Sequence, residues 1–239
     1  MPQTFIDNWI KTKGWKLHDH QIKMIQSGAS GSSSLLIAPT GGGKTLAGFL
    51  PSIIELNACP TNSLHTIYIS PLKALTVDVA RNLLNPLSEM GLKITVETRT
   101  GDTPQSKRQR QRKSPPNILL TTPESLALLI SYPDSAAIFQ ELRCVIIDEL
   151  HALAPTKRGD LLSLALARLN KWAPKARRVG LSATIPYPEE MAEYLSCGQK
   201  IKTVQIIQAQ PTKKPMLQIL IGNSPLPWSG HMGMYAVAE

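Results

Sequence analysis

The stretch Ala38–Thr45, Ala-Pro-Thr-Gly-Gly-Gly-Lys-Thr, constrains the fold of this chain more than any other feature. A short apolar run, Leu35–Ile37, precedes it, and Leu46–Leu50 reads as a helix. The order of strand, glycine loop, Lys-Thr and helix is typical of a phosphate-binding loop. Glycines let the backbone N–H groups converge on a polyphosphate, and the helix N-terminus adds partial positive charge. We therefore predict a nucleotide site at Ala38, Pro39, Thr40, Gly41, Gly42, Gly43, Lys44 and Thr45.

Two side chains of this loop are expected to carry chemistry. Lys44 is able to reach the β- and γ-phosphates of ATP, and Thr45 offers a hydroxyl to Mg²⁺. A glycine-rich turn without function is the plain alternative. Such turns rarely place Gly-Lys-Thr directly after an apolar strand, so the functional interpretation is favoured.

A second signal is the pair Asp148-Glu149 at the end of the apolar run Val145–Ile147. Asp148 is expected to hold the same Mg²⁺, and Glu149 to orient or deprotonate the attacking water. Helix capping before Leu150 is the alternative for this acidic pair. Lys44 and Asp148 are expected to approach one magnesium–triphosphate from neighbouring strand ends of a single sheet.

Residues in three further segments are expected to support this site. His151 follows the acidic pair, and we predict that it links the nucleotide to a second domain. Ser182, Ala183 and Thr184 end another strand, where the two hydroxyls are able to bond to Asp148 or His151. Gln21, in a helix before the loop, is able to donate to and accept from an adenine edge.

Alternating strands and helices predict an α/β fold with a mainly parallel sheet and helices on both faces. The expected strands span residues 35–38, 66–70, 93–98, 117–121, 143–148 and 178–182, with two more at 201–207 and 216–221. We divide the chain into N-terminal helices (1–33) carrying Gln21, an ATP-binding domain (34–200), and last strands with a linker (201–239). Residues 28–34 are expected to form a flexible Gly/Ser link.

Three loops after strands are candidates for contact with a nucleic-acid backbone. Lys73 begins a helix, Arg99, Thr100 and Gly101 follow a strand, and Thr122 precedes the helix that starts near Pro123. Their hydroxyls, cations and free N–H groups suit phosphate oxygens rather than bases. A net charge of +9 agrees with an anionic partner. The basic run Lys107–Lys113 is expected to be either a solvated mobile face or a loop lining a groove.

Composition excludes several other classes. Cys59, Cys144 and Cys197 are scattered and lack metal-ligand spacing, which fits a reducing cytosol. No apolar stretch is long enough to span a bilayer, and the N-terminus has no signal-peptide core, so we expect a cytoplasmic protein without a membrane partner.

Taken in order, these motifs resemble superfamily-2 helicases. The match is narrower for the strings Pro-Leu-Lys-Ala-Leu, Thr-Arg-Thr-Gly-Asp-Thr, Thr-Thr-Pro-Glu-Ser-Leu, Asp-Glu-Leu-His and Gly-Leu-Ser-Ala-Thr, which are similar to the large helicase-related (Lhr) family. Lys157-Arg158-Gly159 fits the same family and adds Arg158 to the nucleic-acid candidates. The Thr-Arg-Thr-Gly-Asp-Thr string, the Arg/Gln-rich run and Pro227–His231 look most like the ligase-associated DExH-box branch.

The resemblance implies a RecA-like, three-layer fold and a bacterial, ATP-dependent DNA helicase or translocase tied to DNA repair. The implied partners are single-stranded or partly duplex DNA, with RNA as an open alternative, and a DNA ligase or nuclease. It also implies a second RecA-like domain and accessory domains, which do not follow in this sequence. We therefore expect the first motor domain alone, natural or truncated, with slow hydrolysis and no unwinding.

Other functions were weighed against this interpretation. A DEAD-type RNA helicase domain is disfavoured by His151, where that family has Asp. A non-hydrolysing, nucleotide-sensing module that binds nucleic acid stays open because no second motor domain follows. A kinase or GTPase with the same loop explains none of the later motifs.

Overall fold

A computed structural model describes residues 4–183, 185–196 and 204–209. Within these residues, seven strands form one parallel sheet in the order β3-β4-β2-β5-β6-β1-β7. The strands are β1 (Ser34–Ile37), β2 (Thr66–Ile69), β3 (Val96–Arg99), β4 (Ile118–Thr121), β5 (Cys144–Ile147), β6 (Arg177–Ser182) and β7 (Gln205–Gln208). The prediction of a mainly parallel sheet is confirmed. The strand expected at 216–221 and most of the linker lie outside the described residues.

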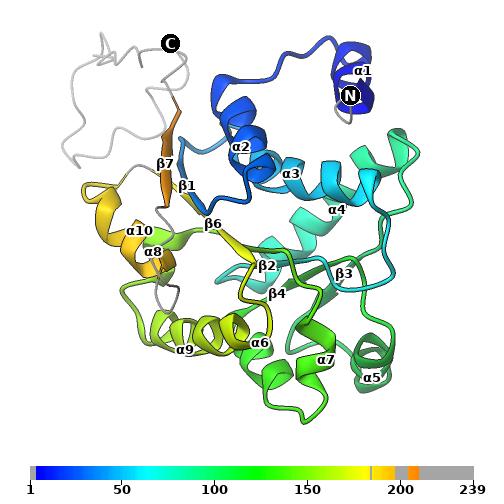
Figure 1. Cartoon of the computed structure of the whole chain (residues 1–239), viewed down its shortest axis with the longest axis vertical. Helices are drawn as coiled ribbons and strands as arrows, with labels where there is room; N and C mark the ends of the chain where they lie inside the picture. Colours follow the sequence, from blue (N-terminus) through cyan, green and yellow to red (C-terminus); the bar gives the residue numbers. More distant parts are fainter. Residues whose placement is uncertain (1–3, 184, 197–203, 210–239) are drawn as a thin grey trace, which may run out of the picture.

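Ten helices belong to the described part of the chain, and most cover the two faces of the sheet (Figure 1). They are α1 (Thr4–Thr12), α2 (Asp19–Ala29), α3 (Lys44–Ala58), α4 (Lys73–Glu89), α5 (Gln105–Lys113), α6 (Pro123–Ile130), α7 (Ser135–Phe139), α8 (Leu150–Leu153), α9 (Lys157–Trp172) and α10 (Pro188–Ser196). None of these helices is long and apolar enough to cross a membrane.

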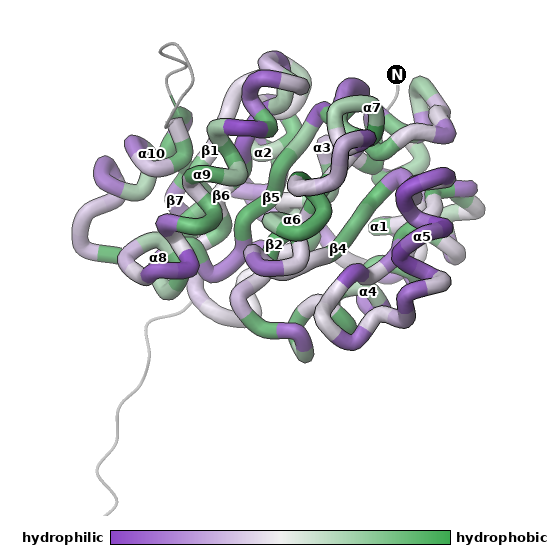
Figure 2. Tube along the Cα trace, turned by 90° about the horizontal axis from the view of Figure 1, so that it is seen from below, coloured by the Kyte–Doolittle hydropathy of each residue, from purple (hydrophilic) through white to green (hydrophobic). Residues whose placement is uncertain are grey.

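Strand side chains alternate between two apolar layers, which explains the three-layer arrangement. Leu35 and Ile37 of β1 pack with α6, α7, α8, α9 and α10 on one face. Leu36, between them, packs with α2, α3 and α4 on the other face. Helix α1 packs outside this second layer through Ile6 and Trp9. Figure 2 shows the hydrophobic central strands and the hydrophilic α5 at the edge.

The predicted Gly/Ser link at 28–34 is wrong at both ends, because α2 runs to Ala29 and Ser34 already belongs to β1. Gly28 stays helical for a packing reason. A Cβ at Gly28 would lie 2.4 Å from the Cβ of Pro51 in α3, so only glycine permits this close crossing of α2 and α3.

The basic run is a helix, so neither the mobile face nor the basic loop describes it. Helix α5 lies beside β3, where Arg110 pairs with Glu97 and Arg112 pairs with Asp134. Gln111 donates to the Thr98 carbonyl. These tertiary partners offset the repulsion within a helix that carries Lys107, Arg108, Arg110, Arg112 and Lys113.

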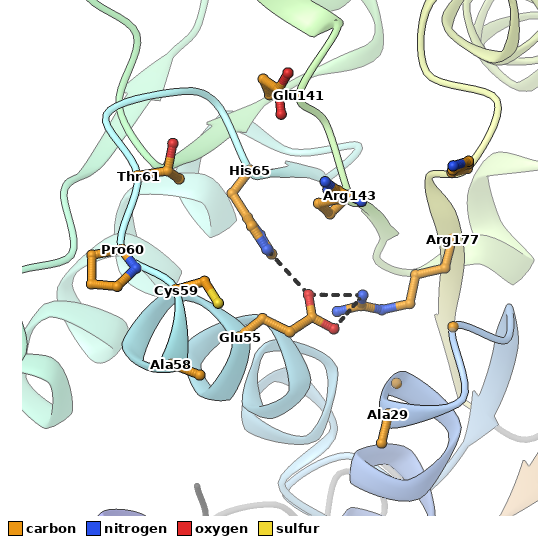
Figure 3. Close-up of a pocket in the computed structure, with 13 residues that line it drawn as sticks. Ala29, Glu55, Ala58, Cys59, Pro60, Thr61, His65, Glu141, Arg143 and Arg177 are labelled. Carbon is orange, nitrogen blue, oxygen red and sulfur yellow. Dashed lines mark hydrogen bonds and ion pairs between the residues drawn. The ribbon is translucent and has the colours of Figure 1, made fainter.

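The amino ends of the strands are joined by an ionic cluster in which Arg177 and His65 are buried and Glu55 is half-buried. Glu55, near the end of α3, accepts two hydrogen bonds from Nη1 of Arg177, at 2.7 and 3.0 Å. Nε2 of His65 lies 3.1 Å from the same carboxylate. These three side chains line a pocket of about 590 Å³, shown in Figure 3. The cluster ties α3 to the starts of β2 and β6, at the edge opposite the motif loops.

We expect loss of this cluster to destabilise the fold. Arg177→Met removes the cation beside the half-buried Glu55 carboxylate and should lower the free energy of unfolding by about 1–3 kcal/mol, measured by urea denaturation at neutral pH. Lys175→Met, at an exposed position of the same pocket, is the matched control and should change little. Equal stability of the two variants would contradict a structural role for the cluster.

The cluster should also make stability depend on pH. Burial raises the pKa of Glu55, but the bonds from His65 and Arg177 outweigh it and hold the pKa below its usual 4.5. A lowered folded-state pKa stabilises the fold above 4.5, and this contribution is lost as the pH falls through the folded-state value. In Glu55→Gln, the free energy of unfolding should therefore fall less between neutral and acidic pH than in the wild type, as measured by urea denaturation at each pH. An unchanged profile would contradict this expectation.

Candidate nucleotide and nucleic-acid sites

The loops that carry the motifs open on one edge of the sheet, because the strands run parallel and these loops follow their carboxyl ends. The strand order divides this edge in two. Strands β5, β6 and β1 lead to the residues predicted to bind nucleotide, and β2, β4 and β3 lead to most of those predicted to bind nucleic acid. The two halves meet where β5 pairs with β2.

The expectation that Lys44 and Asp148 follow neighbouring strands is wrong, because β6 lies between β1 and β5. Their loops still open on the same edge. The intervening strand places Ser182 between the two loops, and the Ser182 carbonyl accepts a hydrogen bond from the Ala38 N–H at 3.1 Å. The sequence motifs do not reveal this insertion, since strand order depends on tertiary packing.

The phosphate loop adopts the conformation that its glycines allow. Gly41 and Gly43 have φ of +77° and +71°, in the left-handed region that favours glycine. Helix α3 begins at Lys44, directly after Gly43. The Lys44 ammonium is buried and donates to the Ala38 carbonyl at 2.9 Å. The loop's own backbone therefore holds this cation at the start of a helix, where a polyphosphate is favoured.

Asp148 is a nearly buried carboxylate that accepts two hydrogen bonds. The Tyr68 hydroxyl donates to Oδ2, and the Glu149 N–H donates to Oδ1 at 2.8 Å. Burial, and then the charge and hydrogen bond of Asp148, raise the pKa of Tyr68, which keeps its phenol protonated as a donor. Sequence reasoning missed Tyr68, because a tyrosine within an apolar strand gives no separate signal.

Glu149, His151 and Ser182 form a short polar chain. Nε2 of His151 lies 3.5 Å from the Glu149 carboxylate, and its Nδ1 lies 3.1 Å from the Ser182 hydroxyl. Of the two partners expected for the Ser182 hydroxyl, Asp148 and His151, the structure shows His151. Ala183 is half-buried beside this chain, and Thr184 lies outside the described residues. The chain connects the acidic loop to the end of β6.

Helix α2 approaches the phosphate loop through Gln21 and His20. Gln21 is 5% exposed, and its Oε1 accepts a hydrogen bond from the His18 N–H at 2.9 Å. Its Nε2 lies 2.9 Å from the place where a Cβ on Gly43 would sit. Nε2 of His20 lies 2.9 Å from the Gly42 carbonyl oxygen. Gln21 thus lies beside the phosphate loop, and His20 is a contact that sequence reasoning missed.

In the half of the edge after β2, β4 and β3, fewer of the residues predicted to contact nucleic acid face outward than expected. Lys73 is exposed, and it pairs with Asp102 at 2.9 Å. Arg99 is 3% exposed and donates to the Arg108 carbonyl, so its guanidinium supports α5 instead of facing outward. Thr100 is also buried, whereas Gly101 is exposed. The outward-facing members of this group are Lys73 and Gly101.

Thr122 and Arg158 mark the starts of two helices. The Thr122 hydroxyl caps α6 by accepting from the Ser125 N–H, and Thr122 is itself buried. Arg158, in the first turn of α9, forms a two-point ion pair with Glu124 of α6. The ion pair holds the first turns of α6 and α9 together.

The oxygen donors of the site fit a Mg²⁺ ion held jointly with a ligand. Among the described residues, no cluster of His, Cys, Asp and Glu is large enough to hold a metal alone. Thr45 and Asp148 supply a hydroxyl and a carboxylate, the hard oxygen donors that Mg²⁺ prefers. Mg²⁺ commonly takes one or two such ligands and completes its shell with phosphates and water.

Comparison with known proteins agrees with this geometry. Residues 18–192 match the family model described as DEAD/DEAH box helicase. The chain is 44% identical over 207 residues to a Mycolicibacterium smegmatis protein named Lhr helicase/probable uracil glycosylase, covering 80% of this chain and 14% of that protein. It is 40% identical to the ATP-dependent helicase Lhr-Core of Methanocaldococcus jannaschii, covering 80% of this chain and 24% of that protein.

Solved structures give the same assignment. The structure of Mycobacterium smegmatis helicase Lhr bound to ssDNA and AMP-PNP superposes with a TM-score of 0.79 at 39% identity, covering 87% of this chain and 28% of that one. The chain thus spans only a small part of these relatives. The fold is RecA-like and similar to that of the Lhr helicases. The chain belongs to the DEAD/DEAH-box helicase family.

Proposed function

We propose that this chain is the ATP-binding motor domain of an Lhr-type, ATP-dependent DNA helicase or translocase. The observation that supports the proposal is that the candidate residues for nucleotide and for nucleic acid lie on one sheet edge. The phosphate loop and Asp148 lie on one half of this edge, and Lys73 lies on the adjoining half.

In the proposed reaction, the phosphate-loop N–H groups and Lys44 bind the triphosphate, and Gln21 lies toward the base. Thr45 and Asp148 would hold Mg²⁺, which supplies charge neutralisation at the phosphates when bound. Glu149 orients the attacking water and accepts its proton. His151 keeps the Glu149 carboxylate in place and carries the contact to Ser182.

Strand β2 offers a route between the two sites. Tyr68 on β2 donates to Asp148, and the Asp148 N–H donates to the Ile69 carbonyl at 2.8 Å. Lys73 begins α4 only four residues after Ile69. A change in the position of Asp148 therefore acts directly on the strand that supports Lys73. We propose that this strand couples nucleotide binding to the grip on nucleic acid.

Unwinding requires more than this domain. Two RecA-like domains must close around ATP while gripping the strand in turn, and arginines from the second domain stabilise the transition-state charge. We therefore propose that the described domain binds ATP, hydrolyses it slowly and does not unwind alone. A role in DNA repair with a ligase or nuclease is proposed from the Thr-Arg-Thr-Gly-Asp-Thr string and rests on that resemblance.

The first test is nucleotide binding. Lys44→Ala should raise the Kd for a fluorescent ATP analogue at least about tenfold, since hydrogen bonds to charged groups contribute about 1.5–3 kcal/mol. Lys171→Ala, at an exposed position in α9, is the control and should bind as the wild type does. No binding by the wild type in the presence of Mg²⁺ would contradict the proposed function.

A second test addresses the support of Asp148. Tyr68→Phe keeps the ring in the core but removes the donor to Oδ2, so the carboxylate should hold Mg²⁺ less well. We expect about a tenfold higher Mg²⁺ concentration for half-maximal ATP binding. Tyr187→Phe, at an exposed tyrosine, controls for the loss of a hydroxyl. A Mg²⁺ requirement that matches the wild type would argue against this role.

A third test separates Lys73 from its acidic partner. Lys73→Ala should weaken single-stranded DNA binding and reduce the slope of log affinity against log salt by about 0.7. Asp102→Asn releases Lys73 and removes a negative charge, so it should strengthen binding. If both variants change affinity in the same direction, Lys73 does not contact phosphate.

The alternatives give different outcomes. A DEAD-type RNA helicase domain predicts ATPase stimulation by RNA and not by DNA, measured side by side. A nucleotide-sensing module predicts tight ATP binding without turnover, even after a second RecA-like domain is supplied in trans. Robust strand displacement by this chain alone would contradict the need for a second domain.

A further inference from the structure

The peptide between Gly42 and Gly43 joins two glycines, so no side chain of its own restricts its rotation. Gly43 and the nearby Gly41 both have positive φ, and glycine crosses between backbone regions at little cost. In a planar trans peptide, the carbonyl of Gly42 and the N–H of Gly43 point in opposite directions. Rotation of this peptide would therefore turn the Gly43 N–H away from a bound phosphate and replace it with a repelling carbonyl.

His20 contacts this peptide from helix α2. Its Nε2 lies 2.9 Å from the Gly42 carbonyl oxygen, and the residue is 7% exposed. A carbonyl oxygen only accepts, so Nε2 must carry the proton and donate it. This bond fixes the direction of the Gly42 carbonyl, and peptide planarity then fixes the Gly43 N–H.

The ring of His20 is itself held in place. It stacks on the His18 ring with centroids 5.3 Å apart and planes inclined by 8°. Both residues belong to the start of α2, where the Gln21 side chain accepts from the His18 N–H. The His20 ring is therefore held by the start of helix α2 and is not a free surface side chain.

The surroundings of His20 favour its neutral form. Burial lowers the pKa of His20, the Gly42 carbonyl partly raises it, His18 lowers it and Asp19 raises it, with a net lowering. The imidazole is then neutral near neutral pH, with its one proton on Nε2. It orients the loop without competing with Lys44 for the phosphates.

We propose that His20 is a positioning residue of the nucleotide site, which holds the Gly42 carbonyl toward α2 so that the Gly43 N–H faces the triphosphate. His20 touches the loop and not the nucleotide. This inference rests on the proposed function, since it assigns a role within the ATP site.

The test compares variants that keep or remove the donor. His20→Leu removes it and should raise the Kd for ATP about fivefold to tenfold, the effect of one lost hydrogen bond. His20→Gln keeps an N–H donor of similar reach and should restore affinity to within about threefold. Lys23→Gln, at an exposed position of α2, is the control. Thermal unfolding of each variant shows whether the fold is intact.

A second readout follows the loop without nucleotide. The backbone amide signal of Gly43 in ¹H–¹⁵N NMR spectra should shift or broaden in His20→Leu and stay close to the wild type in His20→Gln. A packing role alone predicts equal losses in both variants, and that result would overturn the proposal. Wild-type affinity together with an unchanged Gly43 signal in His20→Leu would also overturn it.

The experiments distinguish failure of the His20 proposal from failure of the proposed ATP-binding function. If the wild type binds ATP and Lys44→Ala does not, but His20→Leu is unaffected, only the role of His20 fails. If the wild type binds no ATP, the proposed function fails, and the Gly43 signal still reports whether His20 holds the loop.

Discussion

The position of Asp148 depends on two hydrogen bonds, and much of the arrangement at the carboxyl edge follows from them. A carboxylate that is 6% exposed is costly unless both oxygens are bonded. Tyr68 from the neighbouring strand and the N–H of Glu149 meet that need. One donor comes from β2 and the other from the loop after β5, so satisfying the charge also fixes the junction between the two halves of the edge.

Helices also pack closely on β6, the strand between β1 and β5. A Cβ at Gly180 would lie 2.7 Å from Leu195 and 2.8 Å from Leu150, which shows how tightly α10 and α8 pack on the strand. On the opposite face, a Cβ at Gly48 of α3 would lie 3.1 Å from Leu181. Helices thus approach β6 from both faces at glycine positions. The strand that ends in Ser182 is held directly between the loops of Lys44 and Asp148.

Much of this architecture is predictable from residue order, because apolar runs bounded by turn residues determine local structure. The phosphate loop and the acidic strand end follow from such runs, whereas the sequence left open whether Ser182 meets Asp148 or His151. Strand order is not local, so the place of β6 between β1 and β5 was missed. The same limit explains Arg99 and α5. Sequence shows that these residues are basic, but only tertiary structure shows that Arg99 is buried and that Arg110 and Arg112 already have acidic partners.

The two edges of the sheet divide stability from function. At the amino edge, the Glu55 carboxylate is matched by His65 and Arg177, and the cluster joins three elements. At the carboxyl edge, Glu149 has a φ of 48°, the one non-glycine residue with positive φ in the described part of the chain. Such a conformation costs about 1 kcal/mol or more and persists only where its surroundings enforce it. Here the strained turn lets the Glu149 N–H bond Asp148 while its carboxylate faces His151. The backbone strain therefore serves the geometry of the site, and the ionic cluster on the opposite edge helps the fold to tolerate it.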